Sequence, residues 1–149
     1  MQVTIFKNVF DKKSPHHIPL QTALQRIQEG KSSALVSEVR DGDKTKKQKL
    51  PVVCFSGEFS SRSDDALFEH SGFIVLDFDH VDVEATKRAL ATDDFIHSCW
   101  TSPSGNGVKA LVKITNPERH RDHFRALIKY FERTHGLELD ESGINESRA

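Results

Sequence analysis

The sequence has little of what disulfide-rich and zinc-ribbon domains need, because it contains only two cysteines, Cys54 and Cys99, and no CxxC pair. It also lacks any apolar run near the roughly 18 residues of a membrane span, and residues 1–7 show no secretory signal. We therefore expect a cytoplasmic protein. The formal net charge of −1 excludes a polycation that coats nucleic acid in bulk, so any phosphate-binding surface has to be local.

Internal repeats and low-complexity segments are absent too, so the 149 residues predict a compact fold rather than a solenoid or a disordered tail. We expect residues 1–69 to form a small N-terminal α/β module. Residues 40–49 carry five basic and two acidic side chains and no apolar one, which predicts a solvated loop or, alternatively, a basic flap that contacts a phosphate backbone. The regular elements predicted around this loop are strands at 3–6 and 52–55, a helix at 20–27 and a weaker helix at 34–39.

Residues 70–149 predict the element order β-α-β-β-α-β, which is the split βαβ pattern of ferredoxin-like and RNA-recognition-motif (RRM) folds. The first strand, at 72–79, is apolar on both faces until two carboxylates appear at its end. We therefore predict the α+β class, with an RRM-like core on whose open face the N-terminal module packs. The other predicted elements are a helix from Asp82 to Thr92, strands at 95–101 and 108–114, a helix from Asn116 and Pro117 to Gly136, and an extended segment at 137–140.

In this architecture the strand order 4-1-3-2 brings four chain segments to one edge of the sheet. Neighbouring carboxylates raise one another's pKa unless a cation relieves them, and Mg²⁺ or Mn²⁺ takes a few carboxylates together with substrate phosphates. We therefore predict Asp77, Asp79 and Asp140 as metal ligands and catalytic residues of phosphoryl or nucleotidyl transfer. Backbone amides, hydroxyls and one ammonium group next to these acids are expected to bind the phosphates, and they belong to Ser102, Ser104, Gly105, Asn106, Gly107 and Lys109.

Each of these signals has a simpler interpretation. An Asp-x-Asp pair at the end of a strand is more often a solvated turn or a helix cap than a metal site. The glycine-containing turn by itself is an ordinary hairpin, and Lys109 and Lys113 alone would be a solvated strand face. None of the eight histidines has zinc-binding spacing, and only His80 lies beside the predicted site. The prediction rests on the convergence of three weak signals on one sheet edge.

Three segments resemble the motifs of the archaeo-eukaryotic primase superfamily, namely HSGFIVLDFDH at 70–80, TSPSGNGVKALVKI at 101–114 and LDESGINESR at 139–148. Their order and spacing are most similar to the virulence-associated-E-like (VirE-like) N-terminal domain of mobile elements. The resemblance extends more loosely through LPVVCFSGEF at 50–59, and so covers nearly the whole chain.

The resemblance implies a primase-polymerase type core that uses Mg²⁺ or Mn²⁺ to join a nucleoside triphosphate to a 3′-hydroxyl or a second nucleotide on a single-stranded template. The family's first motif falls on Asp77 and Asp79. Its third motif falls on Asp140, and a downstream arginine falls on Arg148, which the resemblance adds to the phosphate-binding residues. The second motif usually presents a histidine to the triphosphate, and Lys109 stands there instead. Lysine binds phosphate but is no neutral hydrogen-bond acceptor near pH 7, so this departure bears on catalysis.

The resemblance further implies a replication protein of a phage, plasmid or integrated element. Members of this branch are often joined to a helicase-like ATPase. Because the sequence has no Walker A motif, we expect such a partner on a longer form of the chain or on another chain. Residues 70–149 are then a catalytic core truncated at its C-terminus, just after the third motif.

Two other functions stay open. The same scaffold can be a catalytically inactive module that binds single-stranded nucleic acid. The basic residues expected to contact nucleic acid would serve either function, and they are Arg40, the lysines of 44–49, Arg62, Lys109 and Lys113. RRM sheets that stack bases place aromatic side chains on the open face, whereas carboxylates and a lysine are predicted there, which favours the enzyme. A phosphatase of the haloacid-dehalogenase type is less favoured, because His80 and Val81 follow the acidic pair in place of the usual Gly-Thr continuation.

Overall fold

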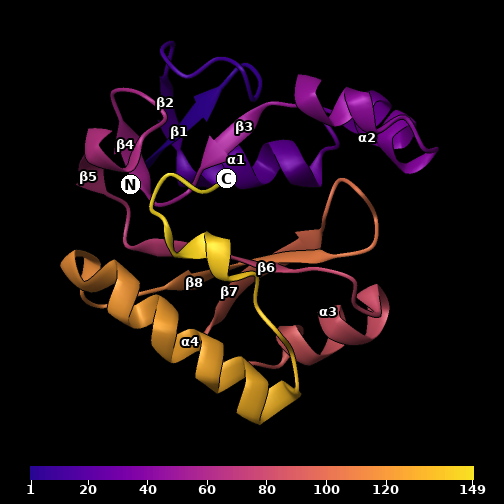
Figure 1. Ribbon diagram of the computed structural model, residues 1–149, viewed down its shortest axis with the longest axis vertical. Helices are drawn as coiled ribbons and strands as arrows, with labels where there is room; N and C mark the ends of the chain where they lie inside the picture. The colour runs from indigo at the N-terminus through magenta and orange to yellow at the C-terminus, as the bar shows by residue number, and fades with distance from the viewer.

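The computed structural model describes all of residues 1–149 and shows a mixed α+β protein, as the sequence predicts. The N-terminal elements lie on one side of a central sheet, and α3 (Val83–Ala91) and α4 (His120–His135) lie on the other (Figure 1). None of the helices combines the length and the apolar character that a membrane crossing requires.

The central sheet contains β6 (Phe73–Phe78), β7 (Ile96–Thr101) and β8 (Val108–Lys113) in the order β6-β8-β7, with both neighbouring pairs antiparallel. This is the order predicted for these three strands. β6 pairs with β8 without interruption, so Asp77 stands opposite Lys109. The antiparallel arrangement differs from the parallel sheet that a phosphatase of the haloacid-dehalogenase type would need.

One face of this sheet is closed by α3 and α4. Side chains alternate along a strand, so Ile74, Leu76 and Phe78 of β6 point toward the helices and join a cluster of twelve buried apolar residues. Phe78 packs edge-on against Phe131 of α4, with ring centroids 5.4 Å apart. This face is the main core of the protein.

The ends of the two helices follow from their sequence, with one exception. The Asp82 carboxylate caps α3 by accepting a hydrogen bond from the Ala85 amide at 3.1 Å. Gly136 ends α4 in the left-handed conformation, as predicted. Asn116 stands at the predicted N-cap position with Pro117 directly after it, but its side chain makes no capping hydrogen bond. A short 3₁₀ helix, η3 (Pro117–Arg119), comes first, and α4 begins only at His120.

The opposite face of the sheet is apolar along one half and charged along the other. Asp77 and Lys109 occupy the charged half. The apolar half consists of Phe73, Val75 and Leu111. It packs against buried residues of the N-terminal elements, namely Val3, Leu20, Ala23 and Phe55.

The N-terminal elements form a second sheet with two helices. Its strand order is β2-β1-β3, with β1 (Gln2–Phe6), β2 (His16–Pro19) and β3 (Val52–Cys54). The helices are α1 (Leu20–Gln28) and α2 (Ser33–Arg40), close to their predicted bounds. The sequence did not predict β2 or the hairpin of β4 (Gly57–Phe59) and β5 (Leu67–His70), because these short strands are rich in histidine and glutamate and lack an apolar alternation.

The prediction of a loop throughout residues 40–49 is wrong, because part of this segment is a 3₁₀ helix, η1 (Lys44–Lys49). The Asp43 carboxylate caps it by accepting hydrogen bonds from the amide and the hydroxyl of Thr45. The buried side chain of Leu50 anchors its other end. Asp43 and Leu50 flank the lysine-rich segment, and the composition of the segment itself does not predict a helix. The helix was therefore missed in the sequence.

The predicted last strand at 137–140 is also wrong. These residues run extended beside β6 but make a single backbone hydrogen bond with it, from the Asp140 amide to the Asp77 carbonyl at 2.9 Å. A 3₁₀ helix, η4 (Glu141–Ile144), follows at once. Gly143 lets η4 approach α4 closely, since a Cβ there would lie 3.2 Å from the ring of Phe124. Packing on α4 therefore replaces further pairing with β6.

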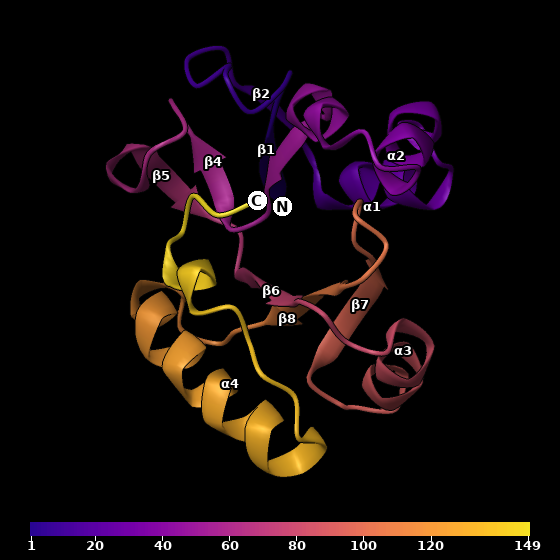
Figure 2. The ribbon, with the colours of Figure 1, turned by 45° about the vertical axis from the view of Figure 1, so that its right-hand side comes forward.

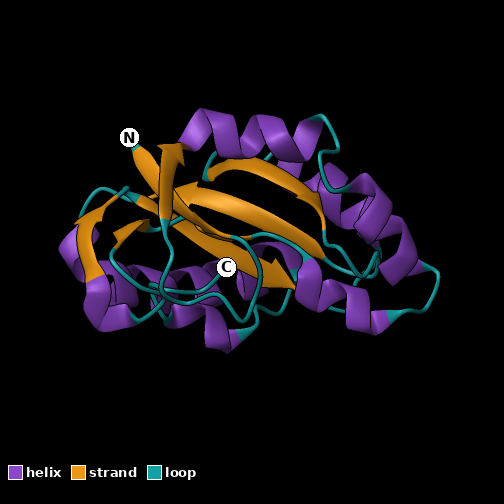
Figure 3. Cartoon of the chain, turned by 90° about the horizontal axis from the view of Figure 1, so that it is seen from above, coloured by secondary structure: helices purple, strands orange, loops and turns teal.

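After η4 the chain crosses to the N-terminal elements (Figures 1 and 2). The Ser147 amide donates to the Asp64 carboxylate at 3.0 Å, and the Cys54 thiol donates to the Ser147 carbonyl at 3.3 Å. Seen from above, the C-terminus lies over the strands near the middle of the molecule rather than at its rim (Figure 3). The last residues thus tie the two sides of the protein together.

Candidate functional site

Asp77 is a buried carboxylate at the end of β6. Its side chain is only 6% exposed, and burying a carboxylate is costly unless charged partners compensate it. Lys109 lies directly across the antiparallel pair, with Nζ at 2.8 Å from Oδ1 and 3.1 Å from Oδ2 of Asp77. The register of the two strands therefore builds an ion pair at the edge where the sequence predicts the site.

Arg148 links two of the predicted acids. One terminal nitrogen of its guanidinium lies 3.3 Å from Oδ2 of Asp77 and 3.2 Å from Oδ2 of Asp140. Lys109 also donates to the carbonyl oxygen of Ala149 at 3.1 Å. The protein's own cations thus relieve the repulsion expected between these carboxylates. We call Asp77, Lys109, Asp140 and Arg148 the ion-pair cluster.

Asp140 is held in its charged form. Burial by itself raises the pKa of the Asp140 carboxyl, but hydrogen bonds from Ser142 and the charges of Arg148 and Lys109 outweigh burial, so that the pKa lies below its usual range. The Ser142 amide and hydroxyl donate to Oδ1 at 3.0 and 2.7 Å. These bonds leave Oδ2 to Arg148.

Asp79 lies just beyond β6, is exposed, and makes no hydrogen bond or ion pair through its carboxylate. The loop between β7 and β8 runs close to it at Gly107. A Cβ at Gly107 would lie 2.8 Å from the Phe78 carbonyl oxygen and 3.5 Å from Cα of Asp79, so only glycine permits this approach. The loop between β7 and β8 therefore packs closely against the chain at Asp79, whose carboxylate has no partner.

Hydrogen bonds within the loop and a bond from α2 fix its shape. The Ser102 amide donates to the Gly107 carbonyl at 2.9 Å, and the hydroxyls of Ser102 and Ser104 are 3.2 Å apart. The Ser104 hydroxyl donates to the Asn106 side-chain oxygen at 2.9 Å. Arg40 reaches over from α2 and donates to the Ser102 carbonyl at 3.1 Å. The loop is therefore held both by its own hydrogen bonds and by Arg40 of α2.

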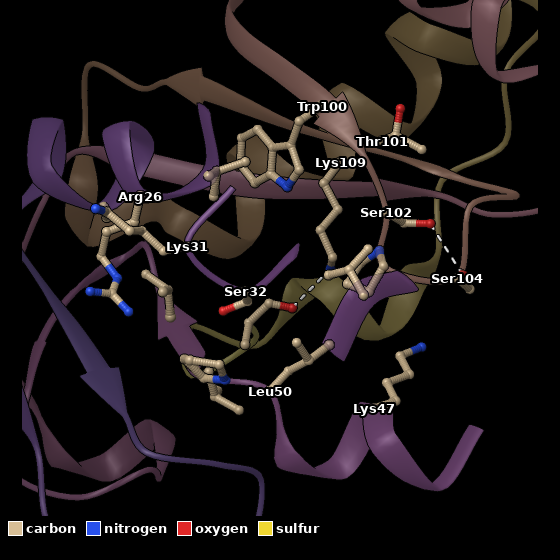
Figure 4. Close-up of a pocket in the computed structure, with 18 of the residues that line it drawn as sticks. Arg26, Lys31, Ser32, Lys47, Leu50, Trp100, Thr101, Ser102, Ser104 and Lys109 are labelled. Carbon is tan, nitrogen blue, oxygen red and sulfur yellow. Dashed lines mark hydrogen bonds between the residues drawn. The ribbon is translucent and has the colours of Figure 1, made fainter. Parts of the chain in front are cut away.

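A pocket of about 610 Å³ opens between the N-terminal elements and the charged half of the sheet, a size typical of small-molecule sites. Asp77 and Asp79 are the only acids that line it. Figure 4 shows Arg26 and Lys31 on one side and Lys47 on the other, with Lys109 reaching in between. In all, six basic side chains line the pocket: Arg26, Lys31, Arg40, Lys47, Lys109 and Arg148. This excess of positive charge suits an anionic ligand.

Half of these cations have no acidic partner. Lys31 pairs with Glu29, and Lys109 and Arg148 belong to the ion-pair cluster. The other three, Arg26, Arg40 and Lys47, lie more than 4 Å from any carboxylate oxygen. Their charges are available to a ligand, because no carboxylate of the protein neutralises them.

The acids fit a divalent cation as a pair rather than as a group of three. Carboxylate oxygens are the ligands that Mg²⁺ and Mn²⁺ take, and Asp77 and Asp140 both contact one nitrogen of Arg148. No three acidic, histidine or cysteine side chains come together in an arrangement that holds a metal ion. The Arg148 guanidinium therefore lies between Asp77 and Asp140, where a cation bound by both carboxylates would have to lie. Asp79 makes no contact with either of them.

Comparison with known protein families matches most of the chain, including much of this site, to one domain family. Residues 45–148 match the BT4734-like, N-terminal domain family. The chain belongs to this family. No curated protein and no solved structure matches it. The match runs from η1 to Arg148, so the BT4734-like domain includes the whole ion-pair cluster. Three pocket cations, Arg26, Lys31 and Arg40, come from outside the matched range.

The BT4734-like domain brings most of the predicted site residues to one place. The ion-pair cluster contains four of them. Three of these four line the pocket together with Asp79, Ser102 and Ser104, whereas Asp140 does not line it. The other turn residues do not line it. Gly105 lies under the Arg40 side chain, Asn106 contacts His80 at 3.4 Å, and Gly107 packs on β6. These three residues shape the loop.

Sequence reasoning missed Arg26 and Trp100, which also line the pocket. Trp100 on β7 stands opposite Lys109 and packs against Phe55 with ring centroids 5.5 Å apart. The hairpin register would have predicted its place beside Lys109, because residues opposite each other in neighbouring strands share a face. No local signal marks Arg26, which reaches the pocket only because α1 packs across the sheet.

Proposed function

We propose that this BT4734-like domain is a primase-polymerase type nucleotidyl transferase of a mobile-element replication protein. It binds a nucleoside triphosphate in the pocket and joins the nucleotide to a strand on a single-stranded template. The observation that carries the proposal is that buried Asp77, which shares Arg148 with Asp140, lies in one pocket with six basic side chains. A triphosphate complements both features, because its oxygens pair with the cations and it brings a divalent cation for the acids.

The proposal includes an RRM-like core of the kind found in the archaeo-eukaryotic primase superfamily and its VirE-like branch. The element order β6-α3-β7-β8-α4 and the strand order β6-β8-β7 support it. Residues 137–140 take the place of the fourth strand beside β6, through the bond from the Asp140 amide to the Asp77 carbonyl. In this interpretation the fourth strand is reduced to an extended segment.

The site residues divide the proposed chemistry among them. Asp77 and Asp140 would hold Mg²⁺ or Mn²⁺, which when bound supplies positive charge to the reacting phosphate and lowers the pKa of the attacking hydroxyl. Lys109 and Arg148 neutralise the two acids in the free protein and pair with phosphate oxygens in the complex. Trp100 offers the base an aromatic surface beside the charged side chains of the pocket.

One observation favours a second function, a catalytically inactive module that binds nucleotides or single-stranded nucleic acid. Asp77 is already paired with both Lys109 and Arg148, and the structure gathers no group of three metal-ligating side chains. In this case the acids fix the two cations in place, and the cations alone bind phosphate.

Nucleotide incorporation on primed and unprimed single strands, with Mg²⁺ or Mn²⁺, tests the proposal. We expect activity in the wild type and a loss of about 10²-fold or more in Asp77→Asn and Asp140→Asn. Asp94→Asn, which changes an exposed acid in the loop between α3 and β7, is the matched control and keeps full activity. Circular dichroism checks that all variants are folded.

Calorimetric titration with a triphosphate separates the two functions. Triphosphate binding without incorporation by the wild type would replace the enzyme by the binding module. If the wild type binds no triphosphate with either metal, both functions are wrong.

A further inference from the structure

The densest positive charge on the protein lies on η1, most of which is outside the pocket. Four of its six residues are lysines, and the whole chain carries a net charge of −1, so the positive charge is concentrated here rather than spread evenly. Only Lys46 has an acid within reach, with Nζ at 4.0 Å from the Glu38 carboxylate of α2. Lys44, Lys47 and Lys49 have no acidic partner and are exposed. We call these three lysines the η1 ridge.

The η1 ridge is an ordered part of the fold. Like charges on one short helix repel, so the segment needs other contacts to stay helical. The Asp43 cap supplies one, with the Thr45 amide at 3.2 Å from Oδ1, and buried Leu50 supplies another. The Asp43 cap and the Leu50 anchor thus hold η1 in place, and with it the three unpaired ammonium groups of the ridge.

The ridge continues the pocket wall outward. Lys47 and Leu50 line the pocket, whereas Lys44 and Lys49 do not. A 3₁₀ helix has three residues per turn, so Lys44 lies above Lys47 on the same side, about 6 Å away along the axis. Lys44 therefore extends the positive charge of the pocket wall, where Arg40 and Lys47 lie, outward along η1. Lys49 follows Lys47 by two residues and lies on an adjacent side of the same short helix.

We propose that the η1 ridge is the path by which the phosphate backbone of a single-stranded nucleic acid leaves the pocket. The inference rests on the proposed function, because it takes a nucleotide-sized pocket as the point where the strand ends. A group of unpaired lysines without interspersed aromatic side chains contacts phosphates rather than bases, so binding along the ridge is independent of sequence and sensitive to salt.

The double variant Lys44→Gln/Lys49→Gln tests the ridge without touching the pocket. The matched control is Lys12→Gln/Lys13→Gln, which removes two exposed lysines from the loop between β1 and β2, on the other side of the N-terminal elements from α2 (Figures 1 and 2). The probe is a fluorescein-labelled oligothymidylate of about 20 nucleotides, and its affinity is measured by anisotropy from about 50 to 200 mM salt. Calorimetry with a triphosphate measures the pocket separately.

For the ridge variant we expect the slope of log affinity against log salt to fall by about 1.4, because each lost phosphate contact on a single strand contributes about 0.7. The ratio of wild-type affinity to variant affinity is then about sevenfold smaller at 200 mM salt than at 50 mM salt. Triphosphate affinity stays at the wild-type value, and the control variant keeps the wild-type slope.

An unchanged salt slope in the ridge variant overturns the inference while leaving the proposed function in place. A wild type that binds triphosphate but not the oligonucleotide overturns the inference together with the use of a single-stranded template, and leaves only the triphosphate site. A wild type that binds neither probe overturns both proposals. Equal loss in the ridge and control variants shows a general charge effect and also rejects the ridge.

Discussion

The two faces of the central sheet are built from alternate residues of the same strands, yet they are closed in different ways. On the helix side, every inward residue of β6 is apolar and α3 and α4 cover it completely. On the other side, the N-terminal elements cover Phe73 and Val75 but leave Asp77 at a pocket. The two-residue alternation of side chains along a strand thus separates a face that stabilises the fold from a face that holds the candidate site. The candidate site begins where the apolar cover stops.

The largest expected effect comes from breaking the helix face. Phe78 is completely buried and contacts Phe131, so Phe78→Ala should lower the free energy of unfolding by about 3–5 kcal/mol. Phe10→Ala is the control, because Phe10 is 72% exposed and its loss should change stability by less than about 0.5 kcal/mol. Urea unfolding measures both, and equal values would contradict the assignment of the core.

A second prediction concerns a pair of histidines where α4 begins. The Gly72 amide donates to Nδ1 of His70, so the neutral His70 ring carries its proton on Nε2 and donates it to Nδ1 of His120 at 2.9 Å. His120 is only 3% exposed, and burial lowers its pKa from 6.5 to about 4, although the charge of Glu146 opposes this shift. Burial also lowers the pKa of His70.

Because the folded protein favours neutral His120, the unfolded chain binds more protons between pH 6.5 and about 4. The stability that neutral His120 contributes is complete above pH 6.5 and is lost as the pH falls toward 4. From pH 7 to 5 we expect a loss of about 2 kcal/mol from this group. His120→Gln should flatten the pH dependence and His123→Gln should not. The same slope in His120→Gln and the wild type would refute this explanation.

The smallest of the three effects concerns the ion pair between Asp77 and Lys109 on the pocket face. Lys109→Met removes the nearer partner of buried Asp77 but leaves Arg148, so we expect a loss of roughly 1–2 kcal/mol, less than for a buried charge left alone. Lys113→Met changes an exposed lysine on the same strand and should alter stability by less than about 0.5 kcal/mol. A neutral result for Lys109→Met in thermal and urea unfolding would show that the pair adds no stability.

Most of the central sheet could be predicted from sequence, because its strands and helices carry strong periodic patterns and clear end signals. The apolar alternation placed Ile74, Leu76 and Phe78 on one face and Asp77 on the other. The failures are short elements whose stability comes from tertiary contacts. η1 depends on its flanking cap and anchor, and residues 137–140 give up pairing with β6 because η4 packs on α4.

The site could be predicted where it depends on strand register and not where it depends on packing between distant segments. The pairing of Asp77 with Lys109 follows from a hairpin and a strand order. The use of Arg148 as a bridge to Asp140 depends on a chain that turns back after η4, and Arg26 depends on the docking of α1. No local pattern carries that information.

The central claim is that a triphosphate and its divalent cation bind on the pocket face. Paramagnetic broadening by Mn²⁺ with a non-hydrolysable nucleoside triphosphate, read from amide signals of the 149-residue chain, tests it most directly. We predict that signals of Asp77, Lys109 and Asp140 broaden first, while Glu132 and Arg133 on the far side of α4 stay sharp. Broadening that spares Asp77 and Asp140, or that needs no triphosphate and spreads over exposed acids, would contradict the account.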